Sequence, residues 1–529
     1  MRFLPRTRGG VLWRALLAGV VVIGFVAATT AVAGLLQVKQ VVDDLNLTKA
    51  LKNVSVQLPA SGQPQTLLLI GADARYGQKG QVGNTDTMLL MRIDDTSSTI
   101  NMLSIPRDLE VQLPIGAGGV MEDTKLNEAY AVGGPQLLLN TLKTQVFPGL
   151  HVNHIVVFSF AGFAKMVNAI GCVYADVDHR YYNNTAQTDY SSIDIQPGYQ
   201  QLCGGTGANL GGPDTALAFV RFRHTDSDEI RNARQQDFIR WAKDEYGTSY
   251  LLDHESTLLT IFGKNSQTDG SLHTTAGLLN LFDLAINADG QELKTIQFPE
   301  AFGPCGGTAQ TPCYVFATSA QAEANAYTEF MTPTTSVPSI GSVSAKSKHG
   351  KHAKSRSAVS AGLTADPGDG KSQSGLVGGV GMPVYYPTKI PSNYAYCFSM
   401  SGNCVEYPNP PSEYDNSYPR KYKINGPDNK PYAAYVFTLV PVSGGETDMA
   451  TGEYFTVQGT TWQDPPLLAH PSAVEKVGGK TLDVYSQGGL ISTVAWHTAH
   501  GVYWIENTLQ NTIPNTQMVA MAASFTRDV

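Results

Sequence analysis

The chain has 529 residues, of which 42% are hydrophobic and 16% are charged, and its formal net charge at pH 7 is -8. This length allows two or three domains, and the apolar fraction is ample for hydrophobic cores. Because the net charge is negative, the composition gives no reason to expect a nucleic-acid partner, and we expect none.

The N-terminus combines positive charge with a long apolar run. Residues 15–36 carry no charge, and a helix of that length, at about 1.5 Å per residue, spans a hydrocarbon core of about 30 Å. Four arginines precede the run, namely Arg2, Arg6, Arg8 and Arg14. The pattern predicts a cytoplasmic tail at 1–14, a transmembrane helix at 15–36 and an extracytoplasmic remainder, hence a single-pass protein of the cell membrane. A cleaved signal peptide is the alternative, since Ala31-Val32-Ala33 resembles a cleavage site, but the length of the run favours a retained anchor.

The following segment alternates strand and helix patterns. The predicted strands are nearly continuous apolar runs at 65–70, 87–93, 99–105 and 154–158. The predicted helices are at 135–146, 160–170, 213–218 and 228–246. This interleaving predicts the α/β fold class, with a central mixed sheet sandwiched by helices, in a domain at residues 60–332.

Residues 333–382 have a different composition. Serine, glycine, proline and lysine are frequent, and large apolar residues are scarce, so we predict a disordered linker. Its basic residues either bind an anionic wall polymer or lipid headgroups, or belong to a solvated spacer.

Residues 383–529 are predicted to form a C-terminal, antiparallel β-rich domain. Its Gly-Gly turns favour hairpins, and its aromatic residues are interpreted as core residues rather than ligand contacts. The predicted strands are at 432–442, 453–462, 473–477, 481–485, 490–497 and 502–506, followed by a helix at 515–525. The sequence does not indicate the function of this domain.

The six cysteines fall into three local couples, and couples of this kind fit an oxidising compartment. Six cysteines permit about 15 connectivities, so the pairing rests on proximity alone. Zinc is the alternative, but no C-x-x-C motif or neighbouring histidine pair supports it. We predict disulfides between Cys172 and Cys203, Cys305 and Cys313, and Cys397 and Cys404.

Two aspartates at strand margins are candidate metal ligands. Asp73 follows one predicted strand and Asp86 precedes the next, so their carboxylates are suited to share one Mg²⁺. Taken singly, each is equally well explained as a turn former or a cap.

Several arginines are candidates for an anion site. Arg107 follows a predicted strand and can reach the same sheet edge. Arg221 and Arg223 are two residues apart, so in an extended segment they face one way. Arg231 and Gln235 are four apart and lie one above the other on a helix. Converging arginines repel one another, so an anion is their natural partner; a solvated charged face is the alternative.

These residues belong to five short segments whose order resembles the LytR-CpsA-Psr family of cell-envelope enzymes over roughly residues 60–300. The segments are Gly71-Ala72-Asp73, Asn84-Thr85-Asp86-Thr87-Met88, Ser104-Ile105-Pro106-Arg107-Asp108, Lys125-Leu126-Asn127-Glu128-Ala129-Tyr130, and Val220-Arg221-Phe222-Arg223-His224 with Arg231, Arg234 and Gln235. The resemblance implies an extracytoplasmic phosphotransferase that joins a glycopolymer from a polyprenyl pyrophosphate carrier to peptidoglycan through a phosphodiester. The linker and the C-terminal domain depart from the short form of that family.

The resemblance also implies roles for single residues. Asp73 and Asp86 hold Mg²⁺, with Mn²⁺ as the alternative, and Asp73 is a candidate base. The catalytic set is Asp73, Asp86, Arg107, Arg221, Arg223 and Arg231, and the substrate-binding set is Arg75, Lys125, Arg234 and Gln235. The polyprenyl tail is expected in an apolar tunnel walled by residues 137–157, next to the membrane. A polyprenyl pyrophosphate hydrolase and a non-enzymatic envelope-binding or regulatory protein are the competing functions.

Overall fold

The fold is that of a computed structural model, which describes most of the chain after residue 49. The described residues are 50–51, 54–60, 62–72, 85–184, 192–205, 216–222, 227–246, 266–274, 276–277, 280–281, 284, 291–303, 313–335, 362–365, 367–398, 404, 418–427, 429–443, 446–447 and 452–527. The predicted tail and transmembrane helix lie outside these ranges. In the part of the chain that is described, no helix has both the length and the apolar character of a membrane span.

A six-stranded mixed sheet is the centre of the N-terminal unit, as the sequence predicted. Its strands, in spatial order, are β11 (Ser266–Thr268), β6 (His154–Ser159), β1 (Gln65–Ala72), β2 (Thr85–Ile93), β3 (Thr99–Ser104) and β12 (Glu292–Ile296). The β1–β6 and β3–β12 pairs are parallel, whereas β1–β2, β2–β3 and β6–β11 are antiparallel.

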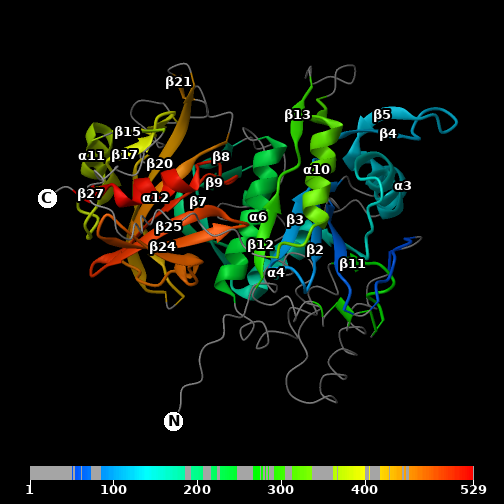
Figure 1. Cartoon of the computed structure of the whole chain (residues 1–529), viewed down its shortest axis with the longest axis horizontal. Coiled ribbons are helices and arrows are strands. Elements are labelled where there is room, and N and C mark those ends of the chain that lie inside the picture. Colours follow the sequence, from blue (N-terminus) through cyan, green and yellow to red (C-terminus); the bar gives the residue numbers. More distant parts are fainter. Residues whose placement is uncertain are drawn as a thin grey trace, which may run out of the picture.

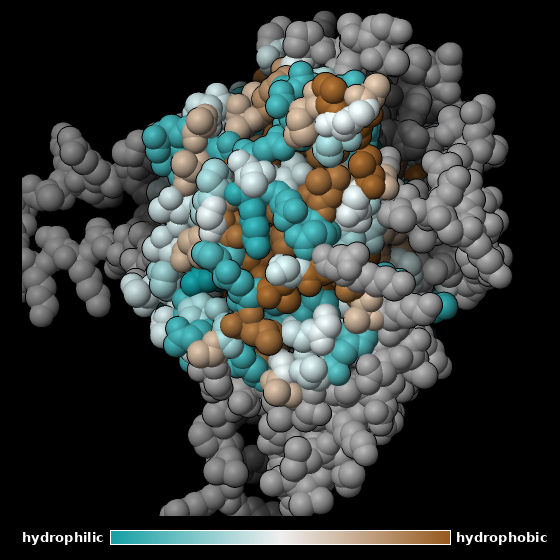
Figure 2. Space-filling view, turned by 90° about the vertical axis from the view of Figure 1, so that its right-hand side faces the viewer, coloured by the Kyte–Doolittle hydropathy of each residue, from teal (hydrophilic) through white to brown (hydrophobic). Residues whose placement is uncertain are grey.

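Helices cover both faces of this sheet, which confirms the predicted α/β sandwich. Successive side chains of β1 point to opposite faces, so that Leu67 and Leu69 join one core while Leu68 and Ile70 join the other. The first core is covered by α4 (Phe160–Ile170), α5 (Ala216–Arg221) and α6 (Asp228–Glu245), and the second by α3 (Leu126–Thr141) and α10 (Ala320–Met331). On the outer face beside α3, apolar and polar side chains are interspersed, as is usual for a surface in water (Figure 2).

Capping explains where two of these helices begin and end. Ser159 caps α4 by accepting a hydrogen bond from the Gly162 N–H, and Gly171 ends the helix in a left-handed conformation with φ 97°. Ser227 caps α6 in the same way, by accepting from the Ile230 N–H. The predicted bounds of α4 are therefore confirmed, and those of α6 are correct to within one residue.

The helix α3 begins at Leu126, nine residues before the predicted start at 135. Gly133 and Gly134 have non-helical backbone angles and Pro135 follows them, so the helix is kinked at this point. The kink separates the helical pattern into two parts, and only the second part was recognised in the sequence. A π-helical segment, Leu142–Val146, continues the helix.

Short two-stranded ribbons complete the N-terminal unit. Their strands are β4 (Glu110–Leu113) with β5 (Glu122–Lys125), β7 (Val173–Val177) with β10 (Gly198–Leu202), β8 (Tyr181–Asn184) with β9 (Ser192–Ile195), and β13 (Glu300–Phe302) with β14 (Val315–Ala317). The predicted disulfides Cys172–Cys203 and Cys397–Cys404 are present. Cys313 is also disulfide-bonded, and its predicted partner Cys305 lies outside the described residues.

The C-terminal unit is a largely antiparallel sheet with a packed helix, as predicted. Its larger sheet contains β18 (Tyr394–Tyr396), β19 (Arg420–Asn425), β20 (Pro431–Ser443), β21 (Glu446–Thr447), β22 (Phe455–Thr460), β23 (Ala473–Val477), β24 (Lys480–Gln487), β25 (Leu490–Thr498) and β26 (Gly501–Glu506). The helix α12 (Asn515–Ala523) is followed by β27 (Phe525–Arg527), which pairs with β16 (Tyr385–Pro387). A 3-10 helix, Pro466–Leu468, connects β22 to β23.

Part of the predicted linker is folded, so the prediction of disorder across 333–382 was wrong for residues 363–365 and 367–376. The strand β15 (Leu363–Ala365) pairs with β17 (Lys389–Pro391), and the helix α11 (Pro367–Leu376) follows. The helix is held from outside, because the buried Gln373 donates from Nε2 to the Cys397 carbonyl at 3.0 Å. Tertiary contacts thus override a glycine- and serine-rich composition that disfavours a helix. The cluster of basic residues in the linker, Lys346, Lys348, Lys351, Lys354 and Arg356, lies outside the described ranges.

One of the hydrophobic cores contains residues of both units. Trp504 and Tyr485 of the C-terminal sheet pack in the same cluster as Leu69 of β1. A buried polar contact accompanies this packing, since Asp176 of β7 accepts hydrogen bonds from Gln458 and from Trp504 Nε1. Figure 1 shows α6 between the orange strands of the C-terminal sheet and the strands β2 and β3.

Candidate functional site

Three predicted site residues meet at one edge of the mixed sheet. The antiparallel register pairs Leu89 of β2 with Ser104 of β3, and continuing it by three residues brings Asp86 opposite Arg107. Arg107 Nη1 donates to Asp86 Oδ1, and Arg221 Nη2 donates to Asp86 Oδ2 at 2.9 Å. The expectation that Arg107 reaches the sheet edge of Asp86 is therefore confirmed.

The charges of this group stabilise one another. Burial opposes ionisation of Asp86, but Arg221 and Arg107 outweigh it and hold the pKa of the carboxyl below its ordinary value. Burial likewise opposes the charge of Arg107, and Asp86, Asp228 and Asp108 outweigh it, so the pKa of Arg107 is raised. Asp86 is consequently an ionised carboxylate held between two cations.

A second layer of acids and bases lies behind this group. Arg107 Nε is 3.9 Å from both Asp108 Oδ1 and Asp228 Oδ2, and Lys125 Nζ is 3.1 Å from Asp108 Oδ1. Asp108 and Asp228 were not among the predicted site residues. Asp108 could have been recognised as a site residue from the sequence, because it directly follows Arg107 in the segment Ser104-Ile105-Pro106-Arg107-Asp108. For Asp228 the sequence provides no indication of a role in the site, apart from its place at the start of a helix.

Arg231 is almost completely buried. Its Nη1 lies 3.3 Å from Asp228 Oδ1, but its Nε and Nη2 make no hydrogen bond within the described residues. Burial lowers the pKa of Arg231, and the charge of Asp228 opposes that effect. Buried N–H groups without acceptors are costly, and an anion would supply the missing acceptors.

The segment that carries Arg221 is helical, so the extended conformation expected for Arg221 and Arg223 is wrong at Arg221. The helix α5 runs to Arg221, and Arg223 lies outside the described residues. Arg234 is buried and donates from Nη1 to the carbonyls of Phe219 at 3.0 Å and Phe222 at 2.9 Å. Because the last carbonyls of a helix lack partners within the helix, these bonds fix the end of α5. Arg234 thus has the contacts of a residue that positions Arg221.

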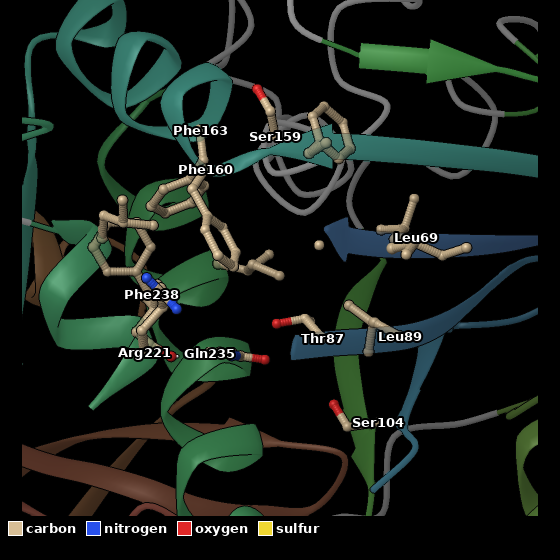
Figure 3. A pocket seen from close by; sticks show the side chains of 16 residues that line it. Leu69, Thr87, Leu89, Ser104, Ser159, Phe160, Phe163, Arg221, Gln235 and Phe238 are labelled. Atoms are coloured by element: carbon tan, nitrogen blue, oxygen red, sulfur yellow. Dashed lines mark hydrogen bonds between the residues drawn. The ribbon is translucent and has the colours of Figure 1, made fainter. Parts of the chain in front are cut away.

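An apolar pocket opens beside the arginines (Figure 3). It encloses about 720 Å³, its mouth included, between the sheet and the helices α4, α5 and α6. Figure 3 shows aromatic rings from the helices on one side and Leu69 and Leu89 from the strands on the other. The lining residues are Leu69, Ile70, Gly71, Thr87, Leu89, Ser104, Phe158, Ser159, Phe160, Phe163, Leu217, Val220, Arg221, Gln235, Phe238 and Ile239.

Two predicted site residues line this pocket, namely Arg221 and Gln235. The Arg221 guanidinium lies over the Phe160 ring, 4.0 Å from its centroid. Gln235 donates from Nε2 to the Val220 carbonyl at 3.0 Å, and its buried Oε1 has no hydrogen-bond partner among the described residues. The pocket therefore suits a ligand with an apolar body and an anionic or polar head.

The position of the pocket differs from the position expected for the apolar tunnel. Residues 137–157 were expected to wall the apolar tunnel, but no residue of that range lines the pocket. Leu138, Leu139 and Leu142 pack instead in the core on the opposite face of the sheet. The sequence could not distinguish the two faces, because the strands are apolar on both.

The metal prediction rests on residues that are only partly described. Asp86 is ionised and lies beside the pocket, which suits a ligand of a divalent cation. Asp73 and Arg75 lie outside the described ranges. Within those ranges, no group of three or more histidine, cysteine, aspartate or glutamate side chains is arranged to hold a metal ion.

Comparisons with known proteins agree with the motifs. The LytR_cpsA_psr family model matches residues 32–330. The teichoic acid transferase TagU of Halalkalibacterium halodurans, named as acting between polyisoprenyl-teichoic acid and peptidoglycan, is 26% identical over 245 residues, which are 44% of this chain and 73% of the relative. The transferase TagV of Bacillus subtilis, of the same description, is 30% identical over 179 residues, 34% of this chain and 42% of the relative. The crystal structure of B. subtilis TagV matches 51% of this chain and 96% of its own, with 22% identity and a TM-score of 0.40.

Proposed function

The chain belongs to the LytR-CpsA-Psr family, and we propose that it is a phosphotransferase that joins a glycopolymer from a polyprenyl pyrophosphate carrier to peptidoglycan. One observation carries the proposal. Arg221 and Gln235 line the apolar pocket, and Arg221 also holds Asp86 together with Arg107. A lipid pyrophosphate has the matching arrangement of an apolar tail and a doubly charged head. The first relative named above is a transferase of this kind, although the TagV match spans less than half of that protein.

In phosphoryl transfer, the protein contributes mainly by positioning the reactants and neutralising their charge. A hydroxyl oxygen of the acceptor glycan attacks the phosphorus that carries the polymer. A new P–O bond forms, the bond to the bridging pyrophosphate oxygen breaks, and polyprenyl phosphate leaves with that electron pair. The acceptor proton passes to a base, for which Asp73 is the candidate. Arg107, Arg221 and Arg231 are the cations that bind the pyrophosphate oxygens and neutralise their charge.

We propose that Mg²⁺ or Mn²⁺ binds at Asp86 together with Asp73. The low pKa of Asp86 fits this role, because a hard cation needs an ionised oxygen ligand. Such an ion would supply further positive charge to the pyrophosphate oxygens. The arginine contacts of Asp86 would compete with such an ion, so an ion bound at Asp86 would leave Arg107 and Arg221 available to the phosphate oxygens.

The proposed site of action is the outer face of the cell membrane, with the N-terminal apolar run as anchor. A carrier embedded in the outer leaflet then presents its pyrophosphate to the arginines and its tail to the pocket. In this arrangement the wall glycan outcompetes water as the acceptor.

Product partitioning tests the proposal. The full-length protein is incubated with a labelled polyprenyl pyrophosphate sugar, with and without peptidoglycan. We expect the label in a phosphodiester-linked glycan when acceptor is present. Free sugar phosphate as the main product at saturating acceptor would favour the hydrolase, and no turnover with intact lipid binding would favour a binding or regulatory protein. Arg221→Ala is the inactive control, and Arg92→Ala, on the other side of the domain near Asp94, is the matched control for loss of an arginine.

A further inference from the structure

The helix α6 is the element that connects the candidate site to the C-terminal unit. At about 100° per residue, Ile230, Ala233 and Arg240 share one side of the helix, and Arg231 and Gln235 lie on the other. Gln235 lines the pocket, and Arg231 belongs to the charged cluster beside it. The opposite side of the same helix is covered by the C-terminal unit (Figure 1).

The C-terminal unit contacts α6 first at its N-terminal turn. Leu509 packs with Ile230 and Ala233 in a small buried cluster. Gly452 lies so close to the same helix that a Cβ atom there would be 2.7 Å from Ile230 Cγ1. These contacts leave the first turn of α6 no room to move toward the C-terminal unit.

A buried hydrogen bond from Arg240 to Glu506 forms the second contact, in the C-terminal half of the helix. Arg240 Nη2 donates to Glu506 Oε1 of β26 at 3.0 Å, and Arg240 Nε donates to Asp237 Oδ1 at 3.0 Å. Glu506 is itself fixed, because Thr493 donates to its second oxygen. Asp237 belongs to α6 itself and orients the guanidinium on the helix. The contact with Glu506 is therefore the one that ties this part of α6 to β26.

We propose that the C-terminal unit is a fixed part of the catalytic fold, and that Glu506 is a positioning residue that holds α6, through Arg240, where Arg231 and Gln235 bind the pyrophosphate. The inference rests on the proposed function for its ligand. It gives the C-terminal unit a role although that unit lies beyond the family match, which ends at residue 330.

The test uses full-length variants and two measurements. The first is hydrogen exchange of the α6 amides at 231–236, which needs no ligand. The second is the affinity for geranylgeranyl pyrophosphate, measured at a temperature at which each variant is folded. For Glu506→Ala we expect at least about tenfold faster exchange and about tenfold weaker binding, the factor typical for the loss of one charge-assisted hydrogen bond.

Two controls separate positioning from general stability. Glu506→Gln keeps an oxygen that can accept from Arg240, so it should restore both values to within about twofold of wild type. Met518→Ala weakens the core on the side of the C-terminal sheet that packs against α12. It should lower the melting temperature but change neither exchange of α6 nor affinity. If Glu506→Ala does not fold, Arg240→Lys replaces it, since an ammonium cannot bridge two carboxyl groups as the guanidinium does.

The outcomes are distinct. Unchanged exchange and affinity in a folded Glu506→Ala protein would overturn the proposal. Equal effects of Glu506→Ala and Met518→Ala, relative to their loss of stability, would also overturn it. If the wild-type protein does not bind geranylgeranyl pyrophosphate, the proposed function fails, while the exchange measurement still decides whether Glu506 positions α6.

Discussion

The guanidinium of Arg221 lies over the ring of Phe160, 4.0 Å from the ring centroid, while its Nη2 donates to Asp86 at 2.9 Å. The two contacts come from different elements, since Phe160 begins α4 and Asp86 belongs to β2. Phe160 contacts the face of the guanidinium and Asp86 bonds its edge, so the two contacts together fix the orientation of the Arg221 side chain. The ring thus places the cation at the boundary between the apolar pocket and the charged cluster.

The first prediction concerns this ring. Phe160→Leu keeps an apolar pocket wall but removes the cation–π contact, which is typically worth about 0.5–2 kcal/mol. We expect the affinity for geranylgeranyl pyrophosphate, measured by calorimetry, to fall by roughly 2- to 30-fold. Phe163→Leu is the control, because it removes another phenyl ring from the same pocket by the same substitution. Equal losses in both variants would mean that only the apolar volume matters.

The second prediction concerns the shape of the cation. Arg221→Lys keeps the charge, but an ammonium can neither stack on Phe160 nor make a two-pronged contact with phosphate. Loss of one charge-assisted contact costs about 1.5–3 kcal/mol, so turnover should fall at least about tenfold. Arg92→Lys, in an ion pair with Asp94 away from the pocket, should have wild-type turnover. A fully active Arg221→Lys enzyme would show that charge alone is enough.

The third prediction separates two roles of Asp86. In Asp86→Asn the arginines lose a carboxylate that competes with phosphate, so pyrophosphate should bind more tightly when EDTA removes divalent ions. The same variant loses a proposed metal ligand, so added Mg²⁺ should no longer increase turnover. Calorimetry in EDTA and a Mg²⁺ titration of activity measure the two effects. Weaker binding in EDTA would mean that Asp86 does not compete with the anion, and a normal Mg²⁺ response would remove Asp86 from the metal site.

Local sequence signals predicted the elements that carry the site, because those signals act over a few residues. The strand runs and the cap at Gly171 defined β1, β2, β3 and α4 closely. The proximity of Asp86 and Arg107 could also be predicted, because the two residues lie at adjacent ends of neighbouring strands. The helical conformation at Arg221 did not, since the short run around it fits a strand equally well.

Contacts between distant segments left no such signal. Arg240 and Glu506 are 266 residues apart in the chain, and neither lies in a recognisable motif. The helix α11 was likewise missed, because its contact with the Cys397 carbonyl, and not its composition, holds it. Both examples involve the C-terminal unit, which the sequence presented as a separate domain beyond a linker.

The last prediction concerns stability and pH. Burial raises the pKa of Glu506 to about 8, and the charge of Arg240 only partly opposes this. Burial also raises the pKa of Asp237, which shares Arg240, to about 6, and the neighbouring Asp176 is raised for the same reason. The ordinary pKa of a glutamate is about 4.3, so between that pH and about 8 the folded state binds more protons than the unfolded state. The contribution of these carboxyls to the free energy of unfolding therefore falls as the pH rises through this window.

Glu506→Gln cannot ionise, so its stability should decrease less between pH 5 and pH 8 than that of the wild type. Thermal unfolding followed by circular dichroism at several pH values measures the difference. Asp464→Asn removes an exposed carboxylate from the same unit and should leave the wild-type pH dependence unchanged. The comparison isolates the Glu506 carboxyl from the other acids with a raised pKa, such as Glu300 near α6, which affect all three proteins alike. Parallel curves for wild type and Glu506→Gln would mean that the Glu506 carboxyl keeps an ordinary pKa beside Arg240.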